Sequence, residues 1–204
     1  TMSIAGVVRE AQVFGPNLEL RREIVCTLGQ PNLTIHDRVT NLGNLPAPHM
    51  ILYHFNLGWS LIDEGAEICW KGKADWVTLA DENDTPDSGR DFMRCPGALD
   101  THRGAAEDCG FIDPAPDADG MCHAGVKNHK LGLKLDISFR VDQLPCLTNW
   151  QHWGPNDYVM GLEPGTAFPE GQTAAREAGR LITLEPGETR TYEVCLGAIG
   201  VAPK

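Results

Sequence analysis

The feature that most constrains the fold is a series of strand-length apolar segments separated by short turns. Four such segments follow one another over residues 4–14, 18–28, 32–42 and 47–57. They are rich in apolar and β-branched residues, and the breaks between them contain glycine, proline and asparagine. Segments of this length joined by short turns usually pair with their chain neighbours. The pattern therefore predicts consecutive antiparallel strands.

The remainder of the chain continues this pattern after one interruption. Residues 81–120 are acidic, rich in glycine and proline and weakly periodic, which predicts a long irregular excursion. Short helices are expected only around 86–93 and 171–178. Further strands are expected at 131–140, 144–149, 157–163, 179–184 and 189–199. With no repeat and no internal linker, residues 1–204 predict a single all-β domain, an antiparallel β-sandwich with an irregular insertion and few short helices.

Composition excludes several classes of partner. A formal net charge of −11 argues against nucleic acid and against anionic membrane surfaces, because both require basic patches. We find no run approaching the ~20 apolar residues of a membrane span. The 7 cysteines are scattered without a C-x-x-C pair, which predicts reduced, packed thiols in a cytoplasmic protein. The histidines show no metal-binding spacing, so we expect neither a metal nor a cofactor.

Glu163 is the first candidate for chemistry. It ends an apolar run that begins at Tyr158, and strand alternation places it on one face with Val159 and Gly161. A carboxylate among apolar neighbours is costly unless it is paired or has to accept a proton. The alternative interpretation is a surface glutamate at the end of a strand.

His54 is the second candidate. It lies in the apolar run from Met50 to Leu57, and Asn56 shares its strand face two residues later. An imidazole and an amide on one face predict a polar pocket. A hydrogen-bonded core histidine is the alternative for either residue alone.

Together these segments resemble aldose 1-epimerases, the galactose mutarotase-like proteins. Tyr53-His-Phe-Asn-Leu-Gly58 is similar to that superfamily's histidine-bearing strand, and Gly161-Leu-Glu-Pro164 is similar to the strand that carries its catalytic glutamate. More closely, the chain resembles an aldose 1-epimerase-like branch of that superfamily, and the likeness covers most of the chain. The resemblance implies a galactose mutarotase-like supersandwich. It also implies a site in which Glu107 contacts the sugar.

The resemblance further implies a mechanism, the interconversion of monosaccharide anomers without a cofactor. Glu163 would act as the base and His54 as the acid in opening and closing the sugar ring. Asn56 would contribute to sugar binding. Trp150, Trp153 or Trp59 could stack on the sugar, although each could instead be a core tryptophan.

Two other functions and one question of completeness stay open. The chain could be a non-catalytic sugar-binding module on the same fold, or an epimerase or isomerase that acts at another sugar carbon. The chain is also expected to correspond to the C-terminal two thirds of the family's fold, without the N-terminal strands. Open strand edges would then be covered by a homo-oligomer or by a companion chain.

Overall fold

The computed structural model describes residues 1–78, 90–104 and 106–202. Their strands are β1 (Met2–Ala11), β2 (Asn17–Cys26), β3 (Asn32–Asn41), β4 (Ala47–His49), β5 (Phe55–Leu57), β6 (Glu67–Cys69), β7 (Gly72–Thr78), β8 (Asp108–Pro114), β9 (Met121–Asn128), β10 (Leu133–Arg140), β11 (Cys146–Gly154), β12 (Asp157–Gly165), β13 (Ile182–Leu184) and β14 (Thr189–Gly200). The helical elements are η1 (Asp100–His102) and α1 (Gln172–Glu177). Within these ranges, no helix is long and apolar enough to cross a membrane.

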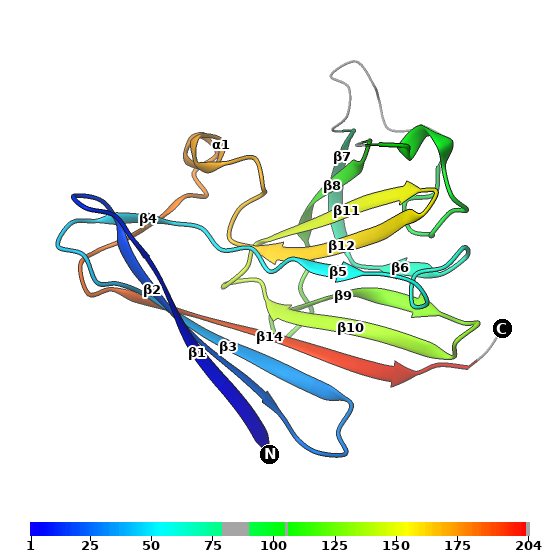
Figure 1. Cartoon of the computed structure of the whole chain (residues 1–204), viewed down its shortest axis with the longest axis horizontal. Helices are drawn as coiled ribbons and strands as arrows, with labels where there is room; N and C mark the ends of the chain where they lie inside the picture. Colours follow the sequence, from blue (N-terminus) through cyan, green and yellow to red (C-terminus); the bar gives the residue numbers. More distant parts are fainter. Residues whose placement is uncertain (79–89, 105, 203–204) are drawn as a thin grey trace.

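The strands form two main sheets and one small sheet, and every pairing is antiparallel (Figure 1). The larger sheet has the order β1-β2-β3-β14-β10-β9-β6, and the second has the order β5-β12-β11-β8-β7. β13 and β4 form a separate two-stranded pair. Figure 1 shows the second sheet on the β10–β9–β6 side of the first, while β1 and β2 project beyond it. The all-β antiparallel fold predicted from sequence is confirmed.

The core lies between the two main sheets. Alternate residues of β9 and β10, such as Val126, Ile137 and Phe139, meet Met160 and Leu162 of β12, and all five are fully buried. The strand period of two explains the arrangement, because the side chains between these positions point to the opposite face of each sheet. On β12 this alternation directs Glu163 away from the core.

Asp37 is a charged residue on the buried face of β3, and its contacts explain why it is tolerated there. Its side chain is fully buried, and Arg22 of β2 binds both carboxylate oxygens at 2.9 and 2.7 Å. The Tyr53 hydroxyl donates a further hydrogen bond of 2.7 Å. A buried carboxylate satisfied by three donors is tolerated in a sheet, and it ties the segment before His54 to β2 and β3.

Several expected boundaries are wrong. The segment 81–120 contains β8, and β9 follows directly, although no strand was expected between residues 58 and 130; β6 and β7 were missed in the same stretch. Because β8 pairs with β7 and β11 on its two sides, its backbone is satisfied by neighbours that local sequence does not reveal. The expected helix at 86–93 lies partly outside the described residues, and Phe92 and Met93 form a turn. The helix expected at 171–178 is confirmed as α1.

β1 forms the outer edge of the larger sheet. All ten of its residues are exposed, and among the described strands it pairs with β2 alone. The expectation that further strands or a partner chain cover this edge stays a prediction.

Candidate active site

Glu163 lies on the outer face of the second sheet, opposite Thr148 of β11. Its side chain is only 3% exposed. Met160 and Leu162 anchor β12 in the core, so the alternation of the strand leaves Glu163 on the other face. Burial, followed by the negative charge of Glu107, raises the pKa of Glu163 from 4.5 to about 7. The carboxyl group can therefore both accept and release a proton near neutral pH.

His54 lies directly against this carboxyl group. It precedes β5, which pairs with β12 so that Asn56 is opposite Gly161. His54 Nε2 is 2.9 Å from Glu163 Oε1, and the imidazole side chain is 46% exposed. The ring is not oriented for a hydrogen bond, and Oε1 is a buried oxygen with no hydrogen-bond donor among the described residues. The imidazole thus covers a carboxylate oxygen that is able to accept a further hydrogen bond.

Gly161 makes room for this contact. A Cβ at this position would lie 2.5 Å from Glu163 Oε1 and 3.4 Å from His54 Cε1. Any side chain there would displace the carboxylate, because real Cβ contacts of 2.5 Å do not occur. The glycine between the two candidate residues is therefore a geometric requirement of the site.

Trp150 and Glu107 extend the site along the same face. The Trp150 indole N–H donates a 2.5 Å hydrogen bond to Glu107 Oε2. The Trp150 ring lies edge-on to His54, with ring centroids 5.9 Å apart, and is stacked with His152 at 6.4 Å. The result is an aromatic surface flanked by two carboxyl groups, Glu107 and Glu163, which suits a ligand with hydroxyl groups and an apolar face.

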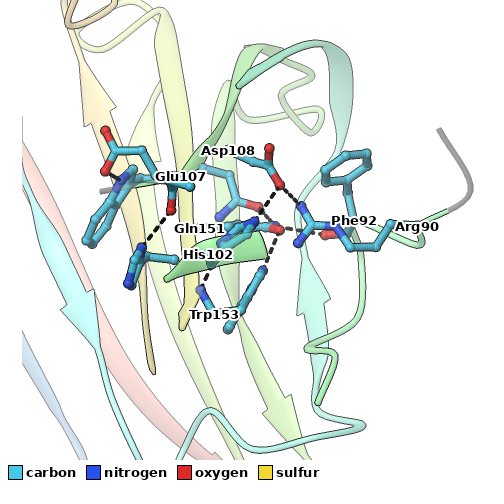
Figure 2. A network of polar contacts seen from close by, with 11 residues as sticks. Arg90, Phe92, His102, Glu107, Asp108, Gln151 and Trp153 are labelled. Carbon is cyan, nitrogen blue, oxygen red and sulfur yellow. Dashed lines mark hydrogen bonds and ion pairs between the residues drawn. The ribbon is translucent and has the colours of Figure 1, made fainter. Parts of the chain in front are cut away.

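A buried polar network supports this face from behind. Glu107 and Asp108 are neighbours in sequence but point in opposite directions, Glu107 toward Trp150 and Asp108 toward the interior (Figure 2). Asp108 forms an ion pair with Arg90, and its Oδ2 is 3.4 Å from His102 Nε2. Since the other His102 nitrogen accepts the backbone N–H of Trp153 at 3.0 Å, Nε2 carries the proton that faces Asp108. The network positions the start of β8 and, with it, Glu107.

The structure thus brings together His54, Glu163, Trp150 and Glu107, while their chemical roles stay predictions. Asn56 is exposed on β5, in register with Gly161. Trp153 was expected among the sugar-binding residues, and this expectation is wrong. Trp153 is completely buried, and its indole N–H donates to Gln151 Oε1 at 3.1 Å. Odd and even positions of β11 face opposite sides, so Trp150 and Trp153 cannot share a surface.

Sequence reasoning missed Gly161, Thr148 and His152 as parts of the site. Thr148 and His152 lie two residues on either side of Trp150, and this spacing was the signal that could have found them. Thr148 Oγ1 is buried with no hydrogen-bond partner among the described residues. Within that same part of the chain, no group of three or more His, Cys, Asp or Glu side chains is placed to hold a metal ion.

Comparisons with known proteins agree with this fold. Residues 1–198 match the family described as domain of unknown function DUF4432. A candidate aldose 1-epimerase from Klebsiella pneumoniae subsp. pneumoniae is 26% identical, with a TM-score of 0.85 over 98% of this chain and 51% of that chain. A second candidate aldose 1-epimerase, from Escherichia coli K12, is 17% identical with a TM-score of 0.67, covering 98% of this chain and 66% of that one.

A galactose mutarotase-like protein from Clostridium acetobutylicum is 12% identical with a TM-score of 0.65, covering 98% of this chain and 63% of that one. The latter two likenesses concern the fold alone. This chain therefore spans about half to two thirds of the length of these solved structures. No curated protein matches the chain. The chain belongs to the DUF4432 family and has the galactose mutarotase-like fold.

Proposed function

We propose that this chain carries the catalytic face of an aldose 1-epimerase-like isomerase that interconverts the anomers of a monosaccharide. The observation that carries the proposal is the contact between His54 and Glu163, a 2.9 Å pair in which the carboxyl group is buried and has a pKa of about 7. Titratable groups with strongly perturbed pKa values gather at catalytic sites. The 26% identical Klebsiella pneumoniae protein, described as a candidate aldose 1-epimerase, supports the same class.

In the proposed reaction Glu163 accepts the proton of the hydroxyl group at C1. His54, as an imidazolium, protonates the ring oxygen while the bond between C1 and the ring oxygen breaks, which leaves an open-chain aldehyde. Rotation about the C1–C2 bond presents the other carbonyl face, and ring closure returns both protons to their donors. General acid–base catalysis of this kind accelerates a reaction by roughly 10²–10⁴-fold. No electrons are exchanged, and the two residues end in their starting states.

The geometry places one condition on this mechanism. His54 and Glu163 touch, so a sugar ring does not fit between them as they stand. The His54 imidazole, which is half exposed, has to turn away from the carboxylate for a hydroxyl group to reach Oε1. Trp150 and Glu107 beside it would then hold the sugar, Trp150 by its ring and Glu107 as a hydrogen-bond acceptor.

The direct contact also favours a second candidate function. If the imidazole stays on the carboxylate, the face can bind a sugar through Trp150 and Glu107 without catalysing ring opening. The chain would then be a sugar-binding module on the same fold. Binding without anomer exchange is the result that would identify it.

The test is anomer exchange measured by NMR on freshly dissolved α-D-glucose and α-D-galactose. We expect the chain to accelerate exchange and Glu163→Gln to abolish most of the acceleration, by roughly 10²-fold or more, while sugar binding survives. Glu170→Gln is the matched control, because Glu170 is an exposed glutamate outside the site. Equal rates for wild type and Glu163→Gln would remove Glu163 from the mechanism.

A further inference from the structure

A cavity lies on the larger sheet, away from the second sheet that carries His54 and Glu163. It has a volume of about 350 Å³ and lies over the outer face of β9 and β10, beside the β8–β9 turn and the corner after β6. A volume of this size is within the range of small-ligand sites, roughly 300–1,000 Å³. Its lining includes Trp70, Lys71, Asp117, His123, Lys134 and Asp136. None of these residues belongs to the site described above.

Asp136 organises the polar wall of this cavity. Lys134 Nζ donates to Asp136 Oδ1 at 2.7 Å, and His123 Nδ1 lies 2.9 Å from Asp136 Oδ2. Burial raises the pKa of Asp136, but the hydrogen bonds from Lys134 and His123 outweigh it, so the pKa is lowered and the group remains a carboxylate. Because a carboxylate can only accept, His123 Nδ1 must be the donor. The His123 Nε2 atom is thereby left facing the cavity wall formed by Asp117.

The turn between β8 and β9 forms the opposite edge of the cavity. Asp117 Oδ1 accepts the backbone N–H groups of Asp119 and Met121, each at 2.9 Å. Its other oxygen, Oδ2, is 3.8 Å from His123 Nε2, which is too far for a hydrogen bond. In the tautomer whose Nδ1 donates to Asp136, Nε2 is an acceptor, as Asp117 Oδ2 is, so a ligand with two hydroxyl groups can donate one hydrogen bond to each of these atoms.

The charge balance of the lining selects the class of ligand. Lys71 and Lys134 bring two positive charges, and Asp117 and Asp136 bring two negative charges. These charges cancel, so neither an anion nor a cation gains a net electrostatic attraction from the four groups. Trp70 adds an aromatic surface among donors and acceptors. This combination fits a neutral molecule that carries several hydroxyl groups.

We infer that this cavity is a second binding site, for a neutral saccharide or polyol, held by His123, Asp117 and Lys134 and bounded by Trp70. The inference is independent of the proposed function, since it uses no residue of the His54–Glu163 site. A chain without isomerase activity would still bind a sugar here.

The test is an amide NMR titration with D-glucose, D-galactose and, separately, inorganic phosphate. We expect the sugars to shift the amide signals of His123 and Met121, and these shifts to persist in Glu163→Gln. Asp136→Asn and Lys134→Met should each weaken the binding by about tenfold or more, the effect expected for one charge-assisted hydrogen bond. Asp142→Asn is the matched control, because Asp142 also pairs with a nearby cation, Arg140, but lies outside the cavity.

Three results would overturn the inference. One is sugar-induced shifts confined to the face of Trp150 and Glu163. Another is a response to phosphate with none to either sugar, which would identify an anion site. The third is unchanged affinity in Lys134→Met, a variant whose side chain lies outside the core and whose fold is checked by its own amide spectrum.

Discussion

Replacing Glu163 by glutamine should separate the stability of this protein from its proposed activity. Burial and the charge of Glu107 raise the pKa of Glu163 from 4.5 to about 7. The folded state therefore binds the proton more tightly than the unfolded state does. The contribution of Glu163 to the free energy of unfolding is fully present below about pH 4.5. It decreases as the pH rises toward 7 and is lost above that pH.

The magnitude follows from the same two values. A tenfold change in a proton-binding constant is equivalent to about 1.4 kcal/mol. The free energy of unfolding of the wild type therefore decreases by roughly 3 kcal/mol between about pH 4.5 and about pH 7. Glutamine has nearly the same shape and no charge, so the Glu163→Gln protein avoids this loss. The variant should match the wild type in acid and exceed its stability by up to roughly 3 kcal/mol above neutral pH, while anomer exchange disappears.

Urea unfolding at a series of pH values from about 4 to about 9 measures this difference. Glu170→Gln supplies the control, since Glu170 is exposed and its variant should follow the wild type throughout. A stability difference between Glu163→Gln and wild type that does not change with pH would refute the raised pKa. A wild type that becomes the more stable of the two at alkaline pH would refute it as well, and with it the case for a base that works near neutrality.

Three further outcomes are expected. Gly161→Ala should lower anomer exchange by about 10²-fold with little loss of stability, because its Cβ would displace the flexible end of Glu163; an unchanged rate would contradict this. Arg22→Met should destabilise the fold by about 3 kcal/mol in urea, because it leaves the buried carboxylate of Asp37 without its two strongest donors, and a loss below about 1 kcal/mol would count against that pair. Trp153→Phe should lower the free energy of unfolding, because Trp153 is completely buried, but it should leave sugar affinity unchanged in a titration. Weakened sugar binding would show that Trp153 contributes to the site.

Local sequence was enough for several strands of the larger sheet and for two residues of the candidate site, but it did not predict β6, β7, β8 or β9. Alternation and turn residues located β2, β3, β10 and β14 to within a few residues, because each has one face in the core. His54 and Glu163 were recognisable from short segments, each a polar group within an apolar run. Strand β8 was not recognisable, because its acidic and glycine-containing sequence forms a strand only between two neighbours.

The tertiary structure alone decided what these residues can do. Two tryptophans three positions apart on β11 lie on opposite faces of the sheet. The register of β11 against β12 places Trp150 beside His54, whereas Trp153 lies in the core. The pairing of β8 with β11, in which Asp108 is opposite Gln151, directs Asp108 into a buried network and Glu107 toward the site. The pKa of Glu163 depends on burial and on a carboxylate 56 positions away in the chain, and neither is encoded in its immediate neighbours. Strand period is a local property that sequence carries, whereas register, burial and charge proximity arise only when the sheets pack.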